Sequence, residues 1–131
     1  MADDSCVLCH EHQESEEHIF GRYRKSLEVR IAVNKWWNLL PSTDAGLEDF
    51  FVDVDNSHLQ PNKNLFKAIV SQAYVWAIWK GRNEALFNDH VFNSFLVANV
   101  IQANAYQWCR DRSPFGRGYS WVNWCCNPDN L

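Results

Sequence analysis

Residues 61–87 read PNKNLFKAIVSQAYVWAIWKGRNEALF, and this stretch decides the fold. Its apolar side chains return every three or four residues over about seven turns, which is the period of an α-helix. The apolar positions include Leu65, Phe66, Ile69, Val70, Ala73, Trp76, Ala77 and Leu86. Pro61 and Asn62 open the run, and proline suits the first turn of a helix. The sequence therefore predicts one long helix that ends near Phe87.

The same period returns downstream, between residues 91 and 111. Its positions are Phe92, Phe95, Leu96, Asn99, Val100, Ala103, Tyr106 and Trp108. The short Asn88-Asp89-His90 break suits a cap and a turn, so the two helices are predicted to form an antiparallel hairpin. The tail from residue 118 contains few helix-forming residues and is predicted to be irregular, with Trp121, Val122 and Trp124 covering the hairpin.

Upstream, residues 24–40 also carry apolar side chains at helical spacing, and Pro41 stops the run. The apolar positions are Leu27, Ile31, Val33, Trp36, Trp37, Leu39 and Leu40. Turn-forming residues dominate from 41 to 62, which is predicted to be a connector. The first amphipathic helix thus precedes the hairpin by about twenty residues of chain.

The expected fold is mainly α-helical: a short zinc-knuckle-like N-terminus, an amphipathic helix, a long antiparallel hairpin and an irregular aromatic tail. A chain of 131 residues suffices for one core. We divide it into residues 1–40, the connector 41–62, and residues 63–131. The aromatic share of 15 % supplies apolar material for the core, while a mean hydropathy of −0.40 indicates no excess of it.

The first twenty-odd residues present a set of metal-binding side chains. Cys6 and Cys9 are two residues apart, and His18 follows. A Cys-x2-Cys turn lets two thiolates reach one ion, and a structural zinc takes four nitrogen or sulfur ligands. His12 or His10 lies close enough to supply the fourth donor; water or the Tyr23 phenol are alternatives. The opposing interpretation is a decayed site whose cysteines are ordinary thiols.

Two motifs in this chain resemble the zinc-binding domain that follows the reverse transcriptase of plant non-LTR (LINE-type) retroelements. The first is CVLCHEHQESEEHIFGRY, residues 6–23, where that family shows Cys-x2-Cys, an acidic spacer and His-Leu-Phe-x2-Cys. Tyr23 stands at the position of the last family cysteine. The second is VWAIWKGRN, residues 75–83, followed by Phe87, which resembles the VWxIWxxRNxxxF segment downstream of the family's zinc module.

The resemblance implies a fragment of a retroelement polyprotein. The parent activity is RNA-directed DNA synthesis, but the polymerase and ribonuclease H domains are expected to be absent, so we expect no enzyme and no catalytic residue. The implied cofactor is zinc, and the implied partner is RNA or DNA, bound weakly. The alternative is a small helical protein-interaction module, or a remnant without a selected function, that meets another protein through its Trp-rich surface.

The net charge of −4 does not favour binding of the whole chain to a nucleic acid. Contact with phosphate would therefore depend on a local group of basic residues. After an acidic start, the basic residues Arg22, Arg24, Lys25 and Arg30 follow. They are the candidate phosphate contacts; a solvated helix face is the plainer interpretation.

The second motif places Trp76, Trp79 and Asn83 on one helix stripe. Core packing is the plainer expectation, with Arg82 capping carbonyls or pairing with Glu48, Asp49 or an acid of a neighbouring helix. The other possibility is that the Trp rings or Arg82 stack on unpaired bases.

Five cysteines, no secretion-signal pattern and no long apolar run lead us to expect an intracellular protein of the nucleus or cytoplasm, neither secreted nor embedded in a membrane. Cys109 is expected to be buried, and Cys125 and Cys126 to be free thiols, with metal ligation as the alternative for this pair. No motif indicates a small-molecule substrate.

Overall fold

The computed structural model describes residues 5–40 except 7, 10, 12 and 16, followed by residues 61–112, 120–126 and 128. The chain is mainly α-helical, as predicted. The described residues form a single π-helical turn, η1 (Glu17–Arg22), and four α-helices: α1 (Arg24–Trp36), α2 (Pro61–Phe87), α3 (Ser94–Arg112) and α4 (Trp121–Cys126). The only β-pairing among the described residues is an isolated antiparallel bridge between Ser5 and Gln13.

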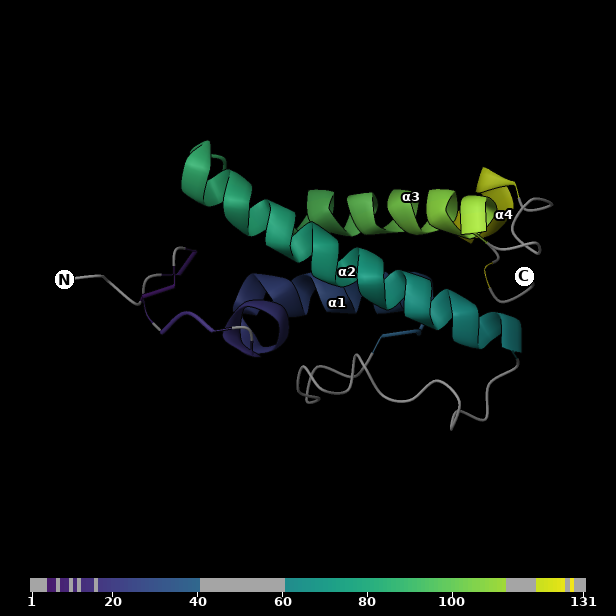
Figure 1. The fold of residues 1–131 in the computed structure, drawn as a ribbon, viewed down its shortest axis with the longest axis horizontal. Helices are drawn as coiled ribbons and strands as arrows, with labels where there is room; N and C mark the ends of the chain where they lie inside the picture. Colours follow the sequence, from purple (N-terminus) through teal and green to yellow (C-terminus); the bar gives the residue numbers. More distant parts are fainter. Residues whose placement is uncertain are drawn as a thin grey trace.

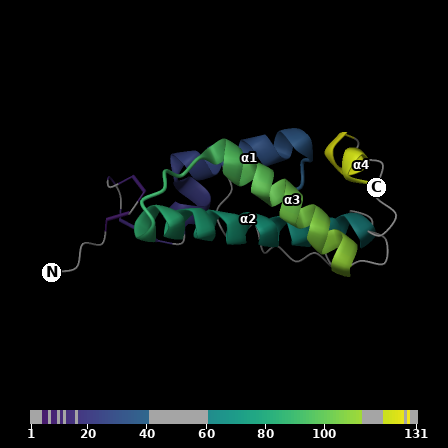
Figure 2. The same ribbon diagram turned by 90° about the horizontal axis from the view of Figure 1, so that it is seen from above.

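The two long helices form the predicted antiparallel hairpin, with α3 running back along α2 (Figure 1). α3 also packs against α1, and seen from above it runs obliquely from beside α1 towards the start of α2, so that it contacts both helices (Figure 2). Asp89 sits in the connection between α2 and α3 and has a positive φ of 57°, a conformation that Asp tolerates better than most residues. None of the described helices is both long enough and apolar enough to cross a bilayer.

A close approach between α2 and the start of α3 depends on Gly81. A Cβ atom at this position would lie 2.8 Å from Cε2 and 2.9 Å from Cδ2 of the Phe92 ring. Phe92 is buried, with 4 % of its surface exposed. Because Gly81 has no side chain, the Phe92 ring can pack directly against the α2 backbone at this position.

The first helix ends earlier than predicted, at Trp36 instead of near Leu40. Trp37 already has an extended backbone, with φ −154° and ψ 116°. The side chain of Asn34 explains the early end, because its Oδ1 accepts from the Leu40 N–H (3.0 Å) and its Nδ2 donates to the Leu40 carbonyl (3.2 Å). These bonds satisfy backbone groups that would otherwise need helical partners.

The aromatic tail is predicted to be irregular, but its residues 121–126 form the short helix α4. Trp124 is fully buried and donates from its indole Nε1 to the Gln102 carbonyl of α3 (3.0 Å). Its own carbonyl accepts from Nε1 of Trp36 (2.7 Å). Trp124 therefore covers the bundle as expected, whereas Trp121 and Val122 remain 44 % and 65 % exposed.

Buried polar contacts join η1 to the helices. The Tyr74 hydroxyl on α2 hydrogen-bonds the carbonyls of Phe20 (2.7 Å) and Ser26 (3.2 Å). The Ser26 hydroxyl donates to the Ile19 carbonyl at 2.6 Å. Because these groups are excluded from water, each bond fixes η1 against α1 and α2 more firmly than a surface contact would.

Candidate metal centre

The Cys-x2-Cys turn lies inside a loop that the Ser5–Gln13 bridge closes. The Leu8 N–H points at Cys6 Sγ, 3.4 Å away. Burial, the largest effect, raises the pKa of the Cys6 thiol, whereas hydrogen bonds from the backbone N–H groups of Cys9 and Leu8 lower it. Such N–H groups favour the thiolate form and hold its sulfur atom in place, as hydrogen bonds around a metal-bound sulfur do.

His18 is placed by the π-helical turn. Ser15, two residues before the turn, anchors its start: its hydroxyl accepts from the His18 N–H (3.1 Å) and its carbonyl accepts from the Ile19 N–H (2.9 Å). It closes with a bond from the Tyr23 N–H to the His18 carbonyl, five residues back. Turns of this width are rare in proteins and occur often at functional sites.

The three predicted donors meet in space. The ligand atoms of Cys6, Cys9 and His18 all lie within 4.8 Å of one another, so this group could hold a metal ion. Cys9 Sγ lies 3.4 Å from His18 Nε2. Sulfur and nitrogen ligands on one tetrahedral zinc lie about 3.5 Å apart, given bond lengths of about 2.3 and 2.0–2.1 Å. The donor types and the Cys9–His18 separation are therefore compatible with a metal ion such as zinc.

A fourth donor is not supplied by the part of the chain that the structure describes: no further Cys, His, Asp or Glu there joins the group. The predicted candidates His10 and His12 lie outside the described residues. Tyr23 lies beside the group, with its ring centroid 5.8 Å from that of His18. Burial raises the pKa of Tyr23 to about 12, and the nearby Cys6 and Cys9 add to the rise.

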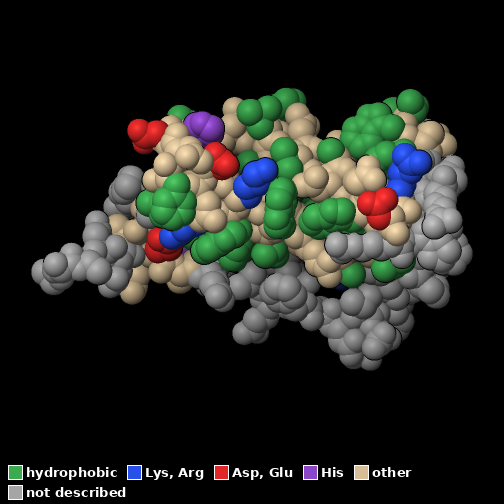
Figure 3. All heavy atoms as spheres, turned by 45° about the horizontal axis from the view of Figure 1, so that its top comes forward, with side chains coloured by type: hydrophobic (Ala, Val, Ile, Leu, Met, Phe, Trp, Pro, Cys, Tyr) green, Lys and Arg blue, Asp and Glu red, His purple; other side chains and the backbone are tan. Residues whose placement is uncertain are grey.

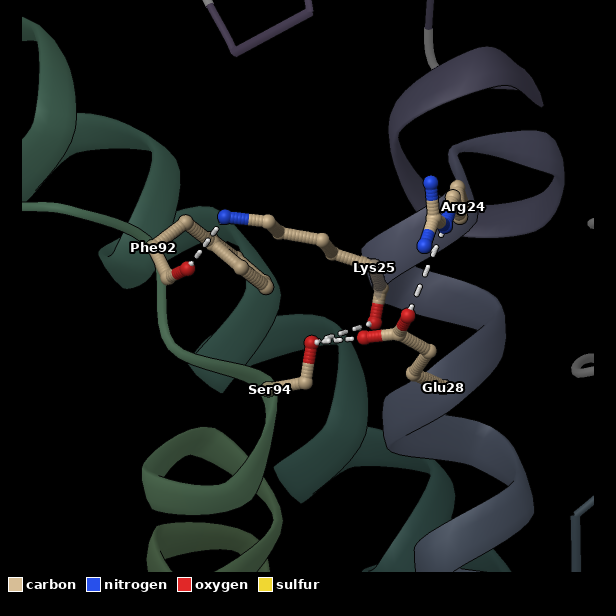
Figure 4. A network of polar contacts seen from close by, with 5 residues as sticks. All are labelled: Arg24, Lys25, Glu28, Phe92 and Ser94. Atoms are coloured by element: carbon tan, nitrogen blue, oxygen red, sulfur yellow. Dashed lines mark hydrogen bonds and ion pairs between the residues drawn. The ribbon is translucent and has the colours of Figure 1, made fainter.

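An open cleft of about 390 Å³ borders the metal group. Its walls are formed by Cys9, Glu11, His18, Tyr23, Arg24, Lys25 and Glu28. Figure 4 shows how the residues of α1 at this cleft are held. The Lys25 ammonium donates to the Phe92 carbonyl (2.9 Å), and Arg24 pairs with Glu28 at 3.6 Å. The Ser94 hydroxyl contacts the Lys25 carbonyl and the Glu28 carboxylate, which links α1 to the start of α3.

The structure corrects the predicted basic stripe at Arg30. This side chain is fully buried, on the α1 face that also buries Ser26, Val29 and Val33, and it hydrogen-bonds Tyr74. A buried guanidinium cannot reach a phosphate, so Arg30 belongs to the core. Arg24 is exposed, Lys25 is half-buried, and the side chain of Arg22 lies outside the described residues.

Arg82 ties the second sequence motif to the metal-binding segment. Its Nε pairs with the Glu14 carboxylate, and its guanidinium lies over the Trp79 ring at 4.8 Å. Sequence reasoning expected an acid from the connector or a neighbouring helix; Glu48 and Asp49 lie outside the described residues. Glu14 was missed because it is one of several acids in the spacer, and nothing in the sequence distinguishes it from the others.

The remaining cysteines give no support for nucleophilic catalysis. Cys109 is buried, as predicted, and burial raises its pKa to about 12. Burial and the neighbouring Cys126 also raise the pKa of Cys125. A thiol with a raised pKa is protonated at neutral pH and is a poor nucleophile. Both have free thiols, as does the exposed Cys126.

Comparison with protein-family models, with curated proteins and with solved structures finds no match to this chain.

Proposed function

We propose that this chain is a non-catalytic zinc-binding module, similar to the zinc-binding domain of plant LINE-type reverse transcriptases, that contacts RNA or DNA weakly. The observation that carries the proposal is the convergence of Cys6, Cys9 and His18, with a Cys9–His18 separation of 3.4 Å. Two thiolates and an imidazole form a donor set typical of zinc.

The contacts of the second motif also support the proposal of a zinc-binding module. In the proposed module, the metal-binding segment rests on α2 through the Arg82–Glu14 pair, whose two side chains are 15 % and 21 % exposed. An ion pair shielded to this degree is screened less by solvent than a surface pair. The two motifs that carry the family resemblance thus touch each other.

Zinc content tests the metal assignment. We expect about one zinc ion per chain, measured by mass spectrometry of the purified protein, because three of the usual four ligands are in place. Cys9→Ser and His18→Ala should abolish binding, whereas Cys126→Ser, which alters an exposed cysteine outside the group, should not. Zinc that appears only in Tyr23→Cys would instead identify a decayed site and favour a remnant without a selected function.

A salt titration of binding to single-stranded RNA tests the partner. Binding should weaken as salt rises, and Arg24→Ala or Lys25→Ala should each reduce the slope of log K against log salt by about 0.7. Arg110→Ala is the matched control, since it removes an exposed cation near the far end of α3. Absence of binding even at low salt would remove nucleic acid from the proposal.

One observation favours the second candidate, a protein-interaction module. Trp76 and Trp79 lie on the same stripe of α2 and are 42 % and 48 % exposed. Figure 3 shows apolar side chains in several groups across one face, with isolated charged side chains between them. Replacing Trp76 by Ala should leave zinc and RNA binding intact if the first proposal holds.

A further inference from the structure

The cleft beside the metal group is large enough to hold water molecules or a small ligand. Its volume of about 390 Å³ exceeds the roughly 30 Å³ that a water molecule occupies in the liquid. Cys9 and His18, two of the three metal donors, form part of its wall. A metal ion held by these donors would therefore border a solvent-filled space.

The charged side chains in the wall of this cleft are balanced, because Arg24 and Lys25 are matched by Glu11 and Glu28. Glu28 pairs with Arg24 and accepts a hydrogen bond from Ser94. Two thiolates neutralise a divalent metal ion, so an anion bound to it would give the centre one negative charge. Arg24 and Lys25 lie in the same wall and can offset part of that charge.

Tyr23 forms part of the cleft wall. It stands at the sequence position where the resembling family has its last cysteine. The ring is held edge-on against Phe92, with centroids 5.9 Å apart, and is 6 % exposed. A phenol is a weaker metal ligand than a thiolate, because it must lose a more tightly bound proton. Packing against Phe92 gives this side chain a role in the core that does not require metal binding.

We propose that the metal ion held by Cys6, Cys9 and His18 keeps an exchangeable fourth ligand, a water molecule that small anions entering from the cleft can replace. Three protein ligands with one open position are typical of zinc sites that exchange ligands with solvent, whereas structural sites are closed. This inference rests on the metal binding proposed above and adds a chemical property to that centre.

Cobalt(II) in place of zinc provides the readout, since its visible absorption reports the ligand set and zinc has no such bands. We expect cobalt sulfate to give a spectrum with sulfur-to-metal charge transfer, and sodium thiocyanate to change the visible bands in a saturable manner. Tyr23→Phe should retain this response. Tyr23→Cys should lose it and raise the charge-transfer intensity about 1.5-fold, because three thiolates replace two.

The charge of the cleft is tested separately. Arg24→Gln should weaken the apparent thiocyanate affinity about 2–5-fold, a modest effect because the Arg24 side chain is 90 % exposed. Arg110→Gln is the control and should leave the affinity unchanged. Arg110 lies sixteen residues along α3 from Ser94, which is about 24 Å from the end of the helix that contacts Glu28.

A cobalt spectrum that thiocyanate does not alter would overturn the inference while leaving metal binding intact. The same conclusion would follow if His10→Ala or His12→Ala changed the cobalt spectrum of the untreated protein, since a histidine would then close the site. Failure of the wild-type chain to bind cobalt or zinc at all would overturn the proposed function together with this inference.

Discussion

Tyr74 shows how much of this small fold depends on a single hydroxyl group. It lies on α2, is fully buried, and bonds carbonyls of both η1 and α1. Burial raises its pKa above the ordinary tyrosine value, although Arg30 acts against the rise, so the hydroxyl keeps its proton at neutral pH. His18 belongs to the same η1 turn as Phe20, so Tyr74 supports the candidate metal centre from the core side.

Replacing Tyr74 by Phe tests this support. The substitution removes the buried hydroxyl that contacts these two carbonyl groups, which should lower the free energy of unfolding by about 1–3 kcal/mol. Urea denaturation of the wild-type and variant proteins measures the difference. Gln72→Ala, on the exposed side of α2, should change stability by less than about 0.5 kcal/mol. Equal effects of the two substitutions would contradict this role of the hydroxyl.

Cys109 predicts a pH dependence of stability. Because the folded chain raises the pKa of this thiol from 9.0 to about 12, the unfolded chain releases the proton first as the pH rises. The resulting stabilisation is complete below pH 9 and declines above it, by about 1.4 kcal/mol per pH unit until about pH 12.

The measurement compares wild-type protein with Cys109→Ala under reducing conditions. Between pH 8 and 10.5, the wild-type protein should lose about 2 kcal/mol more unfolding free energy than the variant. Cys126→Ala, which keeps the buried thiol, should follow the wild-type curve. Parallel curves for wild type and Cys109→Ala would show that this thiol does not titrate differently in the folded and unfolded chains.

Among the secondary-structure elements, α4 offers a matched pair of tryptophans. Trp124 is fully buried against Trp36, Trp37 and Phe66, with ring centroids 5.2–6.0 Å apart. Trp124→Ala should lower the free energy of unfolding by about 3–5 kcal/mol. The Trp121 ring packs against Tyr106, with centroids 5.0 Å apart, and Trp121 is 44 % exposed, so Trp121→Ala should cost about 0.5–1.5 kcal/mol. Thermal denaturation of both variants tests the order, and a larger loss for Trp121→Ala would contradict the observed packing.

The same elements show what local sequence can and cannot specify. The limits of α2 agree with the prediction, because apolar period, Pro61 and the following turn residues are all local signals. The end of α1 depends on the bond between Asn34 and Leu40, and α4 forms where Trp124 meets partners on α1 and α3. The Trp124 partners lie 22 and 88 residues away in sequence, and the Asn34–Leu40 bond forms only once the backbone has left the helix, so the apolar period alone predicted neither feature.

For the molecule as a whole, metal binding should be coupled to folding. The donors come from a loop and a helical turn that Arg82 and Tyr74 attach to α2, so an unfolded chain would not hold them together. Zinc at 100 times its dissociation constant should therefore raise the free energy of unfolding by about 2.7 kcal/mol. Denaturation with zinc and with a chelator measures the increment. Cys9→Ser should abolish it and Cys126→Ser should retain it; an increment that survives Cys9→Ser would place the metal elsewhere.

The spacing in the sequence was enough to predict Cys6, Cys9 and His18 as a group of candidate metal ligands, because all three lie within thirteen residues of chain. The pairing of Arg82 with Glu14 joins residues 68 positions apart and could not be read from either motif. The burial of Arg30 was missed for a related reason. A charged side chain is usually exposed, and the hydrogen bond that Arg30 makes in the core is to Tyr74, which lies on another helix.

The close fit between Gly81 and Phe92 has a consequence for sequence change over evolutionary time. A side chain at position 81 would collide with the ring, so the two positions should vary together: diverged relatives with Ala or Ser at 81 should carry a smaller residue at 92. Independent variation at these two sites would be evidence that the hairpin packs differently there. The pair thus provides a covariation signature by which distant members of this fold can be recognised and aligned.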